Sequence, residues 1–210
     1  MTDRPAETTL RDVAPKPRAP ADPLDTHRAE HYGLLAVLTT RVPTAETLAL
    51  VAGLTGDASP LGRSHAELAQ AAQRADPVRL EREYFRLFIG VGRGELMPYG
   101  SYYLTGFLRE KPLARLRQDL AELGIERAED LVELEDHVGV LCEIMAGLID
   151  GRFEASEADV RRFFTRHVEP WMPRFFADLE TAGSADFYRR VGSVGRNFMS
   201  IETESQALVA

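Results

Sequence analysis

Apolar residues recur along most of the chain at the three- and four-residue spacing of an α-helix, and almost nowhere at the alternating spacing of a strand. The clearest stripes lie in residues 80–88, 113–123, 134–148, 160–171 and 187–201. Weaker helical patterns cover 26–42, 44–53 and 64–75. The pattern therefore predicts an all-α protein, a single-domain bundle of about eight or more helices.

Helix start and stop signals flank these stripes. Asp76 can cap the helix that follows it, and Gly90 ends the same stripe. Ser156 with Asp159 three residues later resembles a capping box. The run 134–148 holds its period for four turns before Gly151, and we expect it to be one continuous buried helix.

Residues 1–24 contain five of the twelve prolines and almost no large apolar side chains, which predicts a flexible N-terminal tail before a helical domain over 25–210. The formal charge of −8 disfavours nucleic acid and anionic membrane and suits a cationic partner. One cysteine excludes an internal disulfide, and no apolar run is long enough to span a membrane. We expect a cytoplasmic protein without stable membrane association.

The longest interruption of the helical pattern, residues 90–106, combines five glycines and one proline with aromatic side chains and predicts a functional loop. Tyr99, Ser101, Tyr102 and Glu95 lie in this loop, and Glu83 lies in the helical stripe before it. Carboxylates can bind guanidinium groups while tyrosines cover apolar side chains. The glycines of 90–94 follow a helix and lack the lysine of a phosphate-binding loop, so they indicate a helix end.

Glu135, Asp136 and His137 open the most regular helical stripe, where we expect the aspartate to cap the helix. Neighbouring residues of a helix point about 100° apart, so Asp136 and His137 do not form a catalytic pair there. They can line a cleft from one side, and Glu135, like Glu83 and Glu95, is a candidate peptide-binding carboxylate. On the apolar stripes, Cys142 is predicted to be a core residue and His167 a buried or boundary residue.

A zinc hydrolase is a minor alternative. His27 and His31 match the inverted zinc-protease pattern, two histidines one turn apart with a glutamate between them. The motif is short, and no third ligand is evident in the sequence. An exposed helix surface explains it more simply.

The order of several segments resembles the TorD/DmsD family, chaperones that proofread twin-arginine-exported molybdoenzymes. The resemblance rests on 83–88 (EYFRLF), 98–103 (PYGSYY), 134–137 (LEDH) and the aromatic residues Trp171, Phe175, Phe176, Phe187 and Tyr188. The sequence departs from the family where Glu135 replaces a common proline and Gly100 a common acidic residue.

The resemblance implies a TorD-like helical fold and a chaperone, not an enzyme. Such a chaperone binds the apo form of a molybdopterin-containing oxidoreductase, its twin-arginine signal peptide or both, and assists cofactor insertion before export. The resemblance places peptide binding at Asp136 and His137 and at the loop of Tyr99, Ser101 and Tyr102. A non-exported client, such as a formate dehydrogenase or nitrate reductase subunit, is the alternative. We expect no cofactor, no metal and no nucleic acid partner, and either a monomer or a homodimer.

Overall fold

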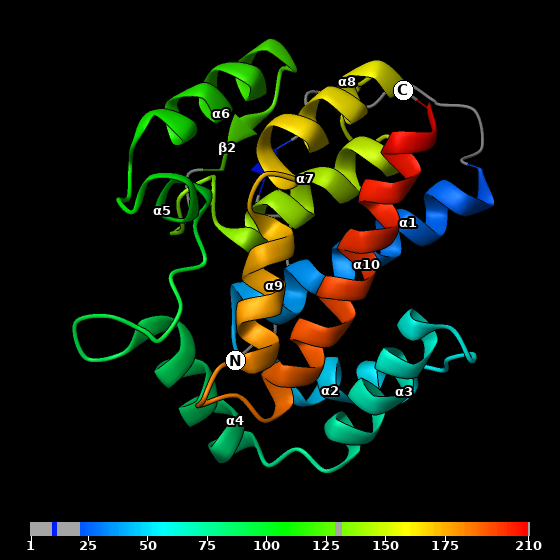
Figure 1. Cartoon of the computed structure of the whole chain (residues 1–210), viewed down its shortest axis with the longest axis vertical. Coiled ribbons are helices and arrows are strands. Elements are labelled where there is room, and N and C mark those ends of the chain that lie inside the picture. Colours follow the sequence, from blue (N-terminus) through cyan, green and yellow to red (C-terminus); the bar gives the residue numbers. More distant parts are fainter. Residues whose placement is uncertain (1–9, 12–21, 129–131, 210) are drawn as a thin grey trace, which may run out of the picture.

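The computed structural model describes residues 10–11, 22–128 and 132–209 of the chain, which fold into ten α-helices, two π-helical turns and two very short strands (Figure 1). The prediction of an all-α fold is confirmed. The helices are α1 (Pro23–Thr40), α2 (Ala45–Ala52), α3 (Pro60–Gln73), α4 (Pro77–Tyr84), α5 (Gly100–Thr105), α6 (Lys111–Glu122), α7 (Val138–Asp150), α8 (Glu157–Phe163), α9 (Met172–Thr181) and α10 (Phe187–Val209). The π-helical turns η1 (Phe85–Ile89) and η2 (Phe164–Val168) continue α4 and α8.

Helix α7 forms the centre of the bundle. Eleven of its thirteen residues are buried, as expected for a helix that is apolar on all sides. Helix α1 packs along it, and α10 packs along α9 and α3 (Figure 1).

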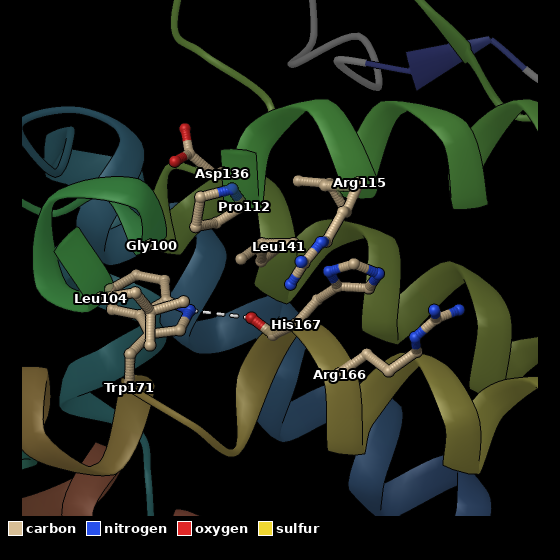
Figure 2. A pocket seen from close by; sticks show the side chains of 10 residues that line it. Gly100, Leu104, Pro112, Arg115, Asp136, Leu141, Arg166, His167 and Trp171 are labelled. Carbon is tan, nitrogen blue, oxygen red and sulfur yellow. Dashed lines mark hydrogen bonds between the residues drawn. The ribbon is translucent and has the colours of Figure 1, made fainter. Parts of the chain in front are cut away.

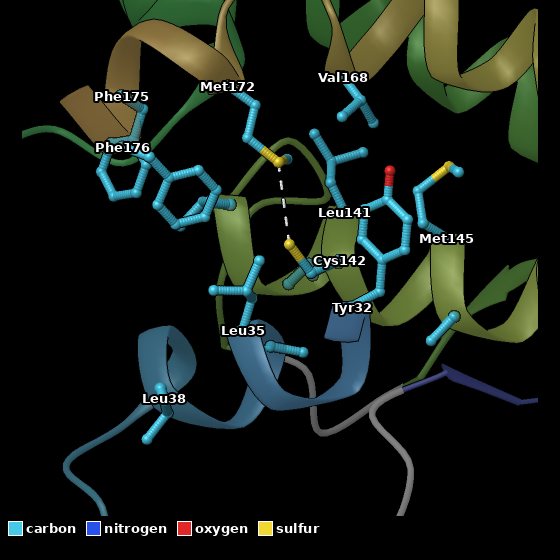
Figure 3. Packing of buried hydrophobic residues seen from close by; sticks show 14 of the residues in the cluster. Tyr32, Leu35, Leu38, Leu141, Cys142, Met145, Val168, Met172, Phe175 and Phe176 are labelled. Atoms are coloured by element: carbon cyan, nitrogen blue, oxygen red, sulfur yellow. Dashed lines mark hydrogen bonds between the residues drawn. The ribbon is translucent and has the colours of Figure 1, made fainter. Parts of the chain in front are cut away.

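Side chains from α1, α7 and α9 interlock in the core (Figure 3). Cys142 is fully buried there, with its Sγ 3.8 Å from the Sδ of Met172, so its predicted place in the core is confirmed. The other labelled members of this cluster are Tyr32, Leu35, Leu38, Leu141, Met145, Val168, Phe175 and Phe176.

Two glycines of α10 set its close approach to α9. A Cβ atom at Gly192 would lie 2.4 Å from the backbone nitrogen of Glu180, and one at Gly195 would lie 2.2 Å from Cδ1 of Phe176. A larger residue at Gly192 would collide with the backbone of α9, and one at Gly195 would collide with the buried ring of Phe176.

Three predictions about helices are wrong. The helix predicted for 134–148 begins only at Val138, because the preceding residues turn to meet the segment before α5. The interruption predicted for 90–106 contains the short helix α5. Ile201, placed on a buried face by the pattern, is 48% exposed.

The predicted N-terminal tail falls mostly outside the described residues. Within it, β1 (Leu10–Arg11) pairs antiparallel with β2 (Glu126–Arg127), and α1 begins at Pro23 after an Asp22 cap. None of the helices in the described ranges is both long and apolar enough to cross a lipid bilayer.

Candidate functional site

The segment that leads into α5 pairs with the segment that leads into α7. The backbone nitrogen of Gly100 donates to the carbonyl of Asp136 at 2.9 Å, and the nitrogen of Val138 donates to the carbonyl of Pro98 at 2.8 Å. A β-bridge joins Tyr99 to His137 between these bonds. The two stretches that the sequence analysis singled out therefore form one backbone-paired unit.

The paired segments use only one of the two carboxylate oxygens of Asp136. Its Oδ2 accepts the backbone N–H of Ser101 at 2.7 Å, so Asp136 fixes the start of α5 instead of capping α7 as predicted. Its Oδ1 is buried and has no hydrogen-bond partner. Since a buried acceptor without a donor is costly, this oxygen is suited to a donor that a ligand brings.

Asp136 contributes to the wall of a pocket of about 210 Å³ that lies between α5, α6, α7 and η2 (Figure 2). Apolar side chains form much of the lining, and polar groups stand at a few points. The lining residues are Gly100, Leu104, Pro112, Arg115, Leu116, Asp136, Leu141, Arg166, His167 and Trp171.

Trp171 is held rigidly in this wall. Its Nε1–H donates to the carbonyl of His167 at 2.8 Å, and the side chain is almost fully buried. A Cβ at Gly100 would lie 3.0 Å from that Nε1, so glycine at this position leaves room for the indole.

The cationic side of the pocket was not predicted from the sequence. Arg166 donates two hydrogen bonds to the Asp119 carboxylate, at 3.0 and 3.1 Å, and Nε2 of His167 lies 2.6 Å from the same carboxylate. His167 is buried, as predicted. Asp119 is thus occupied by two partners, which leaves Asp136 as the carboxylate that lines the pocket.

His137 caps α7 with its side chain. Nδ1 accepts the backbone N–H of Gly139 at 3.1 Å, so Nε2 carries the proton of the neutral ring. Burial lowers the pKa of His137 from its ordinary 6.5 to about 4, and the ring is neutral at physiological pH. The residue is 2% exposed and is not among the pocket-lining residues, so its contribution to the pocket is to position Asp136 beside it.

The three predicted loop residues, Tyr99, Ser101 and Tyr102, differ in burial and in hydrogen-bond partners. Ser101 is fully buried, and its Oγ has no partner. Tyr99 donates its hydroxyl to Glu133 at 2.5 Å, and burial and that carboxylate raise its pKa. Tyr102 is half-buried and accepts a hydrogen bond from Arg93 at 3.1 Å.

The three predicted glutamates are occupied by other parts of the chain. Glu135 pairs with Arg117 at 2.9 Å and Arg127 at 3.3 Å. Glu83 accepts backbone N–H groups at the start of α10, and Glu95 accepts those of Gly183 and Ser184. None of the three lines the pocket, so we leave them out of the site.

The zinc alternative gains no support from the arrangement of ligands. The side chain of His27 is 71% exposed and contacts Glu30 at 3.2 Å. Nδ1 of His31 bonds to the carbonyl of His27. Across the described ranges, no three histidine, cysteine or acidic side chains are grouped to hold a metal ion.

Comparison with known proteins matches residues 55–177 to the family described as nitrate reductase delta subunit. The chain is 24% identical over 137 residues to a chaperone protein TorD from Vibrio atlanticus, and 32% identical over 121 residues to the Tat proofreading chaperone DmsD from Salmonella typhi. These alignments cover 60% and 56% of this chain, and 64% and 57% of the relatives, which is less than two thirds of their length.

The fold has a counterpart among solved structures. A candidate redox enzyme maturation protein from Archaeoglobus fulgidus superposes with a TM-score of 0.58 at 22% identity, over 82% of this chain and 93% of that one. The family match spans more than half of the chain and includes α5, α6, α7 and Trp171, which build the pocket. The chain therefore belongs to the TorD/DmsD family, described in the family model as nitrate reductase delta subunit.

Proposed function

We propose that this protein is a cytoplasmic chaperone, not an enzyme, that binds the apo form of a molybdopterin-containing oxidoreductase through its twin-arginine signal peptide before export. The names of its relatives support a maturation chaperone. Two observations support the peptide-binding site: Asp136 is one of the residues that line the pocket, and the buried Oδ1 of its carboxylate has no hydrogen-bond partner.

An arginine side chain suits this acceptor. A guanidinium group brings several N–H donors and a positive charge to the Asp136 carboxylate, and hydrogen bonds to charged groups contribute about 1.5–3 kcal/mol. The apolar wall of Leu104, Leu141 and Trp171 suits the aliphatic stem of that side chain and an apolar neighbour in the peptide.

The test uses leader peptides of the molybdopterin oxidoreductases encoded in the same genome, with binding measured by calorimetry. Asp136→Asn keeps an oxygen that can accept from Ser101 and removes the charge, so it spares the backbone pairing. We expect it to weaken binding by roughly 10-fold or more, in line with the loss of one charged hydrogen bond. Glu122→Gln, at the exposed end of α6, is the matched control and should bind as the native protein does. Equal affinity of all three proteins would remove the pocket from the proposal.

A non-exported client is the second candidate, favoured by the family description as nitrate reductase delta subunit. Anaerobic capture of clients from the native cytoplasm separates the two. An oxidoreductase captured only with its leader supports the export chaperone. Equal capture after deletion of the leader supports the second candidate.

A further inference from the structure

Helices α1 and α3 bring two histidines together away from the elements that build the pocket. The ring centroids of His31 and His65 are 5.0 Å apart, with a 34° angle between the planes. The His31 ring also stacks on Phe198 of α10 at 5.0 Å. The Nε2 atoms of both histidines are buried without a hydrogen-bond partner.

Hydrogen bonding fixes the tautomer of His31. Its Nδ1 lies 2.6 Å from the carbonyl oxygen of His27, and because a carbonyl only accepts, Nδ1 carries the proton. The neutral ring therefore has a lone pair on Nε2. Metal-binding histidines commonly donate their other ring N–H to a carbonyl in this way, which orients the ring and makes the free nitrogen a better ligand.

His65 presents a second nitrogen of the same kind. A proton on its Nε2 would be buried without an acceptor, so the neutral ring favours a proton on Nδ1 and a lone pair on Nε2. Two imidazole lone pairs then lie in one buried cluster without a donor for either.

We infer that His31 and His65 form a binding site for a late first-row divalent transition-metal ion such as Zn²⁺, with the two Nε2 atoms as ligands. Zn–N bonds of about 2.0–2.1 Å at a tetrahedral angle place two imidazole centroids about 5 Å apart, which matches the observed separation. Imidazole nitrogen suits zinc, copper and nickel.

Water would complete the coordination, since no third histidine, cysteine or acidic side chain of the described ranges is grouped with these two. The site differs from the zinc-protease pattern of the sequence, because His65 replaces His27 as the second ligand. A bound ion would join α1 to α3, two helices far apart in the chain.

The experiment uses the full chain with any purification tag removed, after chelator treatment and buffer exchange. Zn²⁺ is titrated near neutral pH by calorimetry into the native protein and into His31→Gln, His65→Gln and His27→Gln. We expect one ion per native chain and a loss of affinity of at least about 10-fold in the first two variants. His27→Gln is the matched control on the same helix and should bind as the native protein does, because His31 bonds to the backbone carbonyl of that residue.

Thermal unfolding provides a second measurement if His31→Gln unfolds through loss of its stacking on Phe198. Zn²⁺ should then raise the Tm of the native protein and of His27→Gln, and leave the Tm of His65→Gln unchanged. Failure of the native protein to bind one Zn²⁺ per chain would overturn the inference. An affinity of His65→Gln for Zn²⁺ equal to that of the native protein would also overturn it. Neither result bears on peptide binding at Asp136.

Discussion

The carboxylate of Asp136 accepts the backbone N–H of Ser101, 35 residues earlier in the chain, and so ties the start of α5 to the residues before α7. Asp136→Ala leaves that buried N–H without an acceptor, at a cost of about 1–3 kcal/mol. We expect the urea midpoint to fall accordingly, with a smaller loss for Asp136→Asn. Equal losses in the two variants would show that the side-chain bond to Ser101 does not stabilise the fold.

A pocket with one available carboxylate should hold one guanidinium group. Asp119 is already bonded to Arg166 and His167, and Arg115 adds positive charge to the lining. In a double-mutant cycle between Asp136→Asn and Arg→Gln changes in the leader peptide, only one of the paired arginines should show coupling. Coupling of similar size at both arginines would place both groups on the same carboxylate and contradict this arrangement.

Burial of His137 should make stability depend on pH. Its pKa is lowered to about 4, so between pH 6.5 and about 4 the unfolded chain binds a proton that the folded chain does not. The stability present above pH 6.5 is therefore lost as the pH falls, by about 3 kcal/mol in total. His137→Asn keeps an oxygen to cap α7 and should have a flatter profile in denaturant titrations. His27→Asn, at an exposed position, should retain the native slope.

Glu83 anchors the N-terminus of the longest helix. It is 6% exposed and accepts the N–H groups of Asp186, Phe187 and Tyr188 at 2.8, 3.2 and 2.8 Å. Glu83→Ala removes all three bonds and should cost at least about 3 kcal/mol in chemical denaturation. Glu81→Ala, an exposed glutamate of the same helix, should be nearly neutral.

Gly100→Ala should destabilise the protein by about 1–3 kcal/mol, because the added Cβ would lie 3.0 Å from a tryptophan that cannot move. Gly33→Ala is a control in which the added methyl group should stabilise the protein. No atom lies within 4 Å of a Cβ at Gly33 in the middle of α1, so the higher helix propensity of alanine should raise the Tm. A native Tm in Gly100→Ala would mean that the indole yields to the methyl group.

The helical spacing of the apolar residues and the capping residues at helix ends predicted most of the architecture. The capping box of Ser156 and Asp159 and the helix end at Gly90 are present as expected. Local signals could not locate the start of α7, because the pairing of Pro98 with Val138 depends on a partner about forty residues away. The same pairing lets a helix form within the glycine-rich loop.

The candidate site was predicted in part. The sequence pointed to Asp136 and the segment around Ser101, and the structure brings them into contact. Arg115 and Arg166 were missed because isolated arginines on amphipathic helices look like ordinary surface residues. Glu83 was expected to contribute to the peptide-binding surface, although its carboxylate caps α10. Nothing local in a helical sequence distinguishes an exposed glutamate from one that caps a helix a hundred residues later.

The sole tryptophan of the chain, Trp171, lies in the wall of the pocket, with its indole nitrogen bonded to His167 and its ring beside Gly100. All tryptophan fluorescence of the native protein therefore originates at this wall. A peptide that enters the pocket changes the surroundings of that one fluorophore, so the protein carries its own optical reporter of occupancy and needs no attached dye.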